Sequence, residues 1–134
     1  MAAKLEPQTM IDHVSIAVRD LAASADFYER LLAPLGYQKL RDHPATVGFG
    51  KKYPELWLNH RPRGSIDADT GAHVCLRASN REAVDRFHAV ALGAGGKSDG
   101  EPGLRSHYHE TYYAAFIRDP DGNRVEAVTF LAQN

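Results

Sequence analysis

The sequence predicts an α+β fold made of two tandem βαβββ modules. Two short apolar runs begin with the same His-Val pair, at His13 and His73, and the two pairs lie 60 residues apart. A helical pattern of apolar residues follows each run, and a glycine ends each helical pattern, at Gly36 and Gly96. Strand, helix and stop signals that recur together at one fixed spacing indicate a duplicated unit. We therefore interpret the chain as two copies of one module.

The first apolar run and the helix after it place His13 on a defined face. In the run from Ile11 to Val18, branched apolar side chains alternate with a second set that includes His13. Successive side chains of a strand point to opposite faces, so the two sets face opposite ways. Asp20 is a good N-cap for the following helix, which Pro34 and Gly36 end. Since the branched face packs against this helix, we expect His13 to lie on the face away from it.

Three further strands complete the first module. They are expected over Tyr37–Leu40, Ala45–Phe49 and Leu56–Asn59. Stretches rich in proline, glycine and charged residues separate them, as is typical of turns between antiparallel strands. The segment from Arg61 to Gly71 contains a proline, two glycines and two aspartates, and it is the polar linker between the modules.

The second module repeats this plan. Its strands are expected over His73–Ala78, Leu104–Glu110, Tyr112–Arg118 and Asn123–Leu131. Ser79 and Glu82 have the spacing of a capping box, before a helix on which His88 packs at the edge of the apolar stripe. Residues 97–103 are rich in glycine and charge and are expected to form a loop. The run Asp-Pro-Asp-Gly that begins at Asp119 is typical of a tight turn.

Length and composition limit the functions that the chain can have. Its 134 residues fit one domain, expected over 10–131, with modules at about 10–60 and 72–131 and a short tail at 1–9. The chain is 43% hydrophobic with a net charge of −1, so nothing favours nucleic acid or a membrane surface as a partner. No apolar run reaches the roughly 18 residues of a transmembrane helix. The single cysteine, Cys75, makes no internal disulfide, and a reducing cytoplasm is the expected location.

Several motifs together resemble one known superfamily. They are the run from His13 to Leu21, Phe27-Tyr28, the run from Leu35 to Tyr37, His73-Val74, and the run from Phe116 to Glu126 that contains Asp-Pro-Asp-Gly-Asn. Over nearly the whole chain, from about Met10 to Phe130, the sequence resembles the vicinal oxygen chelate superfamily of glyoxalases, bleomycin-resistance proteins and extradiol dioxygenases. The motifs indicate the superfamily and not one reaction within it.

The resemblance implies a curled mixed sheet, or cup, with the helices outside and a divalent metal ion inside. The metal ligands would come from the first and last strands of each module. Carried over to this chain, they are His13, His73 and Glu126. The fourth position would fall to Glu55, but a register shifted by two residues would place Trp57 inside the cup instead. Glu126 and Glu55 are also the candidate catalytic carboxylates.

Two imidazoles and a carboxylate on separate strands form a ligand set that leaves coordination positions open. Such a set suits Fe(II), Zn(II), Ni(II) or Mn(II), and a substrate can bind the open positions through two neighbouring oxygens. A metal ion there polarises a carbonyl and stabilises an enediolate, while a nearby base transfers the proton. Arg124 is expected to share a face with Glu126, so a buried Arg–Glu ion pair without metal is the competing interpretation.

A second group of residues is expected to bind the substrate. In the run from Leu104 to Glu110, Arg105 and His107 alternate on one strand face, and two tyrosines follow. We expect a substrate-binding wall of Arg105, His107 and Tyr113, with Trp57 from the first module; an exposed strand is the alternative interpretation. The planar guanidinium of Arg105 matches a carboxylate or a phosphate.

Two classes of function remain open. The first is a metal-dependent enzyme acting on a small molecule, either a glyoxalase-like isomerase or lyase or, with Fe(II), an extradiol ring-cleaving dioxygenase. The second is a binding protein that sequesters a small molecule in the same cup without metal, since one fold hosts several functions. The resemblance also implies a homodimer, in which open sheet edges are covered. The sequence leaves open whether both histidines of one site come from one chain.

Overall fold

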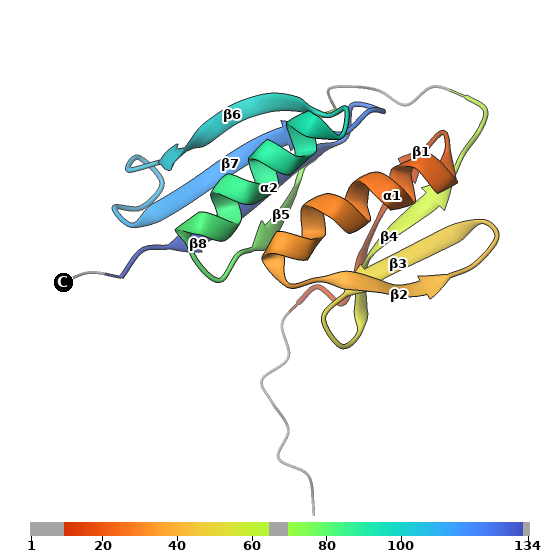
Figure 1. The fold of residues 1–134 in the computed structure, drawn as a ribbon, viewed down its shortest axis with the longest axis horizontal. Coiled ribbons are helices and arrows are strands. Elements are labelled where there is room, and N and C mark those ends of the chain that lie inside the picture. The colour runs from red at the N-terminus through yellow and green to blue at the C-terminus, as the bar shows by residue number, and fades with distance from the viewer. Residues whose placement is uncertain (1–9, 65–69, 133–134) are drawn as a thin grey trace, which may run out of the picture.

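The computed structural model describes residues 10–64 and 70–132 and contains the two expected modules (Figure 1). The first module consists of β1 (Val14–Val18), α1 (Leu21–Leu32), a short 3-10 helix η1 (Ala33–Leu35), β2 (Gln38–Asp42), β3 (Thr46–Gly50) and β4 (Pro54–His60). The second module consists of β5 (Val74–Arg77), α2 (Arg81–Gly93), β6 (Lys97–Leu104), β7 (Tyr112–Arg118) and β8 (Arg124–Phe130). The predicted α+β fold with two βαβββ modules is confirmed.

Each module forms one four-stranded mixed sheet. The strand order is β1-β4-β3-β2 in the first sheet and β5-β8-β7-β6 in the second. In both sheets the first and last strands of the module pair in parallel, and the other neighbours pair antiparallel. This topology places β1 beside β4 and β5 beside β8. The strand that begins just after His13 or His73 therefore lies next to the last strand of its own module.

Local signals explain where the helices begin and end. The Asp20 side chain accepts a 3.1 Å hydrogen bond from the backbone N–H three residues on, and thereby caps α1. The cap of α2 is Asn80 and not Ser79, because the Asn80 side chain accepts the equivalent 2.8 Å bond. After α1, Gly36 adopts a φ of 86°, a left-handed conformation that glycine takes without steric cost.

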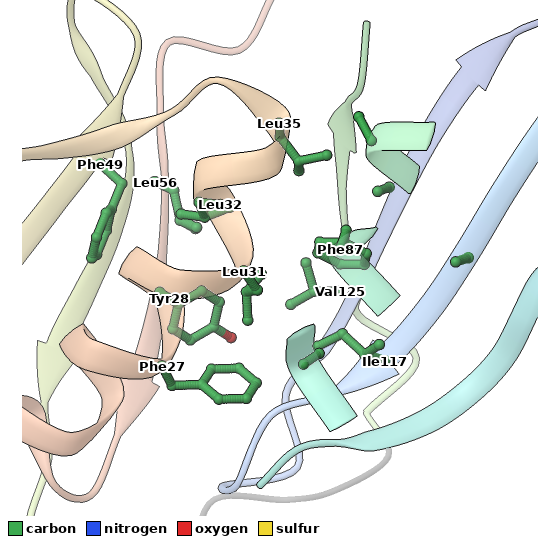
Figure 2. Packing of buried hydrophobic residues seen from close by; sticks show 14 of the residues in the cluster. Phe27, Tyr28, Leu31, Leu32, Leu35, Phe49, Leu56, Phe87, Ile117 and Val125 are labelled. Carbon is green, nitrogen blue, oxygen red and sulfur yellow. The ribbon is translucent and has the colours of Figure 1, made fainter. Parts of the chain in front are cut away.

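The two helices pack against each other and unite the modules in one hydrophobic core. Figure 2 shows buried side chains from both modules meeting between them, among them Phe27 and Leu31 of the first module and Phe87, Ile117 and Val125 of the second. Burying one such side chain contributes about 1.5 to 3 kcal/mol. Each helix covers one face of its own sheet, and among the described residues no helix covers the opposite face, which we call the open face (Figure 1).

The turn from Asp119 to Asn123 joins the second module to the first. Asp119 is buried, and its Oδ2 accepts a 2.7 Å hydrogen bond from the Tyr28 hydroxyl of α1. Asn123 Nδ2 donates to Ala17 O of β1 over 2.9 Å. Burial raises the pKa of the Asp119 carboxyl. Burial and the nearby Asp119 charge also raise the pKa of Tyr28 well above its ordinary value of 10.0.

The predicted bounds of the strand that follows α2 were wrong. Residues 97–103, predicted to form a loop, belong to strand β6, and the residues after Leu104 form a turn that leads into β7. The glycines permit close packing within the strand: a Cβ at Gly100 would lie 2.9 Å from Phe116 Cδ1, and the β6–β7 register shifts on both sides of Gly100. His107 therefore lies in a turn and not on one face of a strand.

Two segments named in the predictions lie outside the described residues. They are the N-terminal residues 1–9 and residues 65–69 of the predicted linker. Where the chain is described, none of its helices is long and apolar enough to cross a membrane. His88, expected at the edge of the apolar stripe of α2, is 4% exposed and its Nε2 lies 2.8 Å from Ser98 Oγ.

Candidate metal centre

The open face of the second sheet brings several candidate residues together. The pairing of β5, β8 and β7 sets Cys75 opposite Glu126 and Glu126 opposite Phe116. Side chains of residues aligned across neighbouring strands point to the same face. The alternate residues Val125 and Ile117 are buried in the core that includes α2. Cys75, Glu126 and Phe116 therefore point away from the helix.

Glu126 is the central residue of this face. Its side chain is only 3% exposed, and its Oε1 lies 3.0 Å from His73 Nε2. Its Oε2 accepts a 2.5 Å hydrogen bond from the Tyr112 hydroxyl. In the competing interpretation Arg124 would pair with Glu126, but the Nε of Arg124 lies 3.6 Å from Asp99 Oδ2. The structure thus brings together two of the three residues predicted as metal ligands, and their nitrogen and oxygen atoms are donors of the kind that divalent metals bind.

Tyr112 and Cys75 complete the surroundings of Glu126. Cys75 Sγ lies 4.0 Å from the Tyr112 hydroxyl oxygen. Burial and the Glu126 carboxylate raise the pKa of Cys75 to about 12. Burial and the hydrogen bond to Glu126 raise the pKa of Tyr112 well above its ordinary value. At neutral pH both groups keep their protons, so Tyr112 is a hydrogen-bond donor to Glu126 and Cys75 is not a thiolate nucleophile.

The first module carries a similar pair on the open face of its own sheet. β1 and β4 run parallel with Val14 opposite Leu56, and the residues that directly precede this pair are His13, just before β1, and Glu55 of β4. Leu56 is buried in the core, and Glu55 therefore points the opposite way, to the face that His13 shares. The His13 side chain is 51% exposed, and its Nδ1 lies 2.8 Å from Asp12 Oδ2.

These two pairs do not meet within one chain. We call His13 with Glu55 the first half-site, and His73 with Glu126 the second half-site. Within residues 10–64 and 70–132, no three side chains of His, Cys, Asp or Glu lie close enough together to hold one metal ion. The residues predicted as one cluster are thus divided between two sheets, and each half-site offers one imidazole and one carboxylate.

Two of the predicted substrate-binding residues lie on the open faces. The guanidinium carbon of Arg105 lies 5.4 Å from the centroid of the Phe116 ring in the second sheet. Trp57 packs over Gly48 in the first sheet, because a Cβ at that glycine would lie 2.9 Å from the indole ring. His107 is exposed in the turn before β7.

Tyr112 takes the position that was expected for Tyr113. Tyr113 is 5% exposed and donates a 2.6 Å hydrogen bond to Asp85 of α2, so it lies beneath the helix. Tyr112 reaches Glu126 on the open face. The alternation of β7 carried this signal, because Ile117 is an apolar core residue and an even number of positions separates it from Tyr113 and not from Tyr112.

The chain thus consists of two βαβββ modules, and each sheet carries a histidine and a glutamate on its open face. The chain matches the sequence profile of the Glyoxalase/Bleomycin resistance protein/Dioxygenase superfamily over residues 10–127. The protein belongs to this superfamily. The resemblance inferred from the sequence motifs is confirmed.

Solved structures share the fold. A glyoxalase/bleomycin resistance protein from Albidiferax ferrireducens T118 is similar with a TM-score of 0.79 and 29% identity, over 90% of this chain and 98% of that chain. A glyoxalase/bleomycin resistance protein/dioxygenase family enzyme from Burkholderia phytofirmans PsJN has a TM-score of 0.67 and 22% identity, over 90% of this chain and 98% of that chain. The second likeness shows the fold alone. No curated protein matches the chain.

Proposed function

We propose that this protein is a glyoxalase-like, metal-dependent enzyme that acts on a small molecule held through two neighbouring oxygen atoms. The observation that supports the proposal is the 3.0 Å contact between His73 Nε2 and the buried Glu126 Oε1. An imidazole nitrogen and a carboxylate oxygen suit Zn(II), Ni(II), Fe(II) or Mn(II), so the residues present fit such an ion.

The residues of the two half-sites divide the chemical tasks. A bound divalent ion would polarise the substrate carbonyl. The C–H group next to this carbonyl would then be easier to deprotonate. Glu55, an exposed carboxylate of the first half-site, would take that proton and return it to the adjacent carbon, a transfer that contributes on the order of 100- to 10,000-fold in rate. The Tyr112 hydroxyl holds one oxygen of Glu126 and fixes the orientation of the carboxylate.

A second copy of the chain would complete each centre. Every chain carries one first half-site and one second half-site, on the open faces of different sheets, and no complete cluster forms among the described residues of one chain. In a two-fold symmetric dimer, the first half-site of each chain can face the second half-site of its partner. Such a dimer has two equivalent centres, each with two histidines and two carboxylates.

Metal analysis of protein purified without chelator tests the proposal. We expect about one divalent ion per chain, since a symmetric dimer holds two centres. Glu126→Gln is expected to lose most of the metal, because an amide oxygen carries no charge to attract the ion. Glu82→Gln, at an exposed position of α2, is the matched control and is expected to keep the metal. Full metal content in Glu126→Gln would show that this residue is not a ligand.

Further outcomes separate the related functions. Absence of stoichiometric metal in the wild type, together with unchanged small-molecule binding in His13→Ala, would assign metal-free sequestration and contradict the enzyme. An Fe(II) protein that cleaves an aromatic diol with oxygen would assign the dioxygenase reaction. Glu55→Gln is expected to abolish isomerase activity while the fold is retained, and an active variant would exclude Glu55 as the base.

A further inference from the structure

We propose that Arg105 is an oxyanion-binding group next to the second half-site, and that the substrate carries a carboxylate or phosphate in addition to its two metal-binding oxygens. This proposal rests on the proposed function, because it defines the part of the substrate that lies beyond the metal.

The guanidinium of Arg105 is held in place by the backbone and not by a carboxylate. Its Nη1 donates to Gly103 O over 3.0 Å, and its Nη2 donates to Glu101 O over 2.7 Å. A guanidinium has five N–H donors, so these two bonds leave donors for a ligand. Among the residues that the structure describes, no acidic side chain pairs with it. A cation that is already positioned loses little conformational freedom when it binds an anion.

Two glycines of β6 give the guanidinium its space. A Cβ at Gly103 would lie 3.3 Å from Arg105 Nη1, and a Cβ at Gly100 would lie 3.2 Å from Arg105 Nη2. The Gly100 Cβ would also lie 2.9 Å from Cδ1 of Phe116, the ring on which the guanidinium lies. A side chain at either glycine would therefore displace the guanidinium or its aromatic support.

Phe116 links Arg105 to the second half-site. It is aligned with Glu126 across β7 and β8, and its ring centroid lies 6.4 Å from that of His73. The guanidinium carbon of Arg105 lies 5.4 Å from the same Phe116 centroid. The His73 ring and the guanidinium are thus separated by no more than these two distances together.

The shape of the guanidinium favours an anion at Arg105. The planar group pairs with two oxygens of a carboxylate or phosphate at once. Its acceptors in the protein, Gly103 O and Glu101 O, are backbone carbonyls without a formal charge.

Two keto acids that differ at one end test the proposal. 2-Oxoglutarate and 2-oxopentanoate share a 2-oxo acid end with vicinal oxygens, and only 2-oxoglutarate has a distal carboxylate. In calorimetric titrations of the metal-loaded protein, 2-oxoglutarate is expected to bind about tenfold more tightly or better, as a charge-assisted pair provides. Arg105→Gln is expected to remove this preference and leave the Kd of 2-oxopentanoate unchanged.

Two further variants separate position from charge. Gly103→Ala keeps the charge of Arg105 but crowds its Nη1, and it is expected to reduce the preference for 2-oxoglutarate. Arg41→Gln removes an exposed arginine of β2 that also donates to a backbone carbonyl, and it is expected to leave the preference intact. Equal Kd values for the two acids in the wild type would overturn the proposal. A preference that survives Arg105→Gln, or that Arg41→Gln reduces as strongly, would overturn it too.

A separate titration distinguishes failure of this proposal from failure of the proposed function. If neither keto acid binds the metal-loaded protein, binding through vicinal oxygens is contradicted. Inorganic phosphate and acetate are then titrated while the Nε–H signal of Arg105 is followed by NMR. A saturable shift of this signal supports the oxyanion site, and the tighter anion assigns phosphate or carboxylate. Absence of a shift with both anions would overturn the role of Arg105.

Discussion

The Tyr28 hydroxyl of α1 donates a 2.7 Å hydrogen bond to Asp119 Oδ2 in the turn before β8, and both residues are buried. The other carboxylate oxygen of Asp119 accepts 2.9 Å hydrogen bonds from the backbone N–H groups of Asp121 and Asn123. One carboxylate therefore shapes the turn and joins it to the first module. Because β8 begins at this turn and carries Glu126, the contact also orients the second half-site.

Replacing Tyr28 with phenylalanine is expected to lower the free energy of unfolding by about 1.5 to 3 kcal/mol, the range for a hydrogen bond to a charged group. The phenyl ring still fills the core, and Asp119 loses one of its donors. Urea denaturation measures the change. Tyr53→Phe is the control, because Tyr53 is 55% exposed and its hydroxyl bonds to the exposed Asp12. Similar losses in both variants would contradict the importance of the junction.

Stability is expected to fall at alkaline pH in a way that depends on Tyr28. The pKa of Tyr28 is raised in the folded protein, chiefly by burial and then by Asp119, so the folded state retains a proton that the unfolded state releases above about pH 10. The free energy of unfolding therefore decreases as pH rises above this value. Tyr28→Phe removes one such proton and is expected to make the decrease shallower, by up to about 1.4 kcal/mol per pH unit. Parallel pH profiles for the two proteins would contradict this.

Two glycines near the end of α2 are expected to respond oppositely to alanine. A Cβ at Gly96 would lie 2.9 Å from Arg118 O and from Phe27 Cζ, so Gly96→Ala is expected to destabilise the protein by about 1 to 3 kcal/mol. A Cβ at Gly93, the last residue of α2, would meet nothing within 4 Å. Gly93→Ala is expected to be neutral or stabilising by up to about 1 kcal/mol. Thermal unfolding measures both, and equal shifts in Tm would be inconsistent with the close packing at Gly96.

Removing the Tyr112 hydroxyl is expected to weaken metal binding without abolishing it. Tyr112→Phe deletes the donor to Glu126 Oε2, and loss of a residue that orients a ligand typically reduces metal affinity about 10- to 100-fold. Competition with a chromophoric chelator measures the affinity. Tyr108→Phe, at a 59% exposed position, is the matched control and is expected to bind metal as the wild type does. An unchanged affinity in Tyr112→Phe would exclude an orienting role.

The sequence predicted the modules well because each structural signal is local. Asp20 caps α1 and Gly36 ends the segment after it, and both effects depend on neighbouring residues only. The loop predicted at 97–103 was wrong because the glycines there respond to tertiary packing. Gly100 stays in a strand since the Phe116 ring needs its space, and no local pattern shows which ring will lie there.

The sequence indicated candidate residues for the site, but it did not indicate how they are arranged in space. The repeated His-Val pair identified His13 and His73, and alternation placed both on open faces. Alternation alone does not show whether two sheets of one chain turn their open faces to the same space. That relation depends on how α1 and α2 pack, which Figure 2 shows as a continuous core between the modules.

In the proposed dimer two chains share each metal centre, and co-expression of two variants distinguishes this arrangement from a centre within one chain. His13→Ala lacks the first half-site and Glu126→Gln lacks the second, so each variant alone is expected to bind little metal. A mixed dimer has one centre with both defects and one intact centre. Co-expression of the two chains is therefore predicted to restore about a quarter of the wild-type metal content when chains pair at random, as two-fold symmetry requires. A co-expressed sample that binds no more metal than the average of the separate variants would contradict the shared centre.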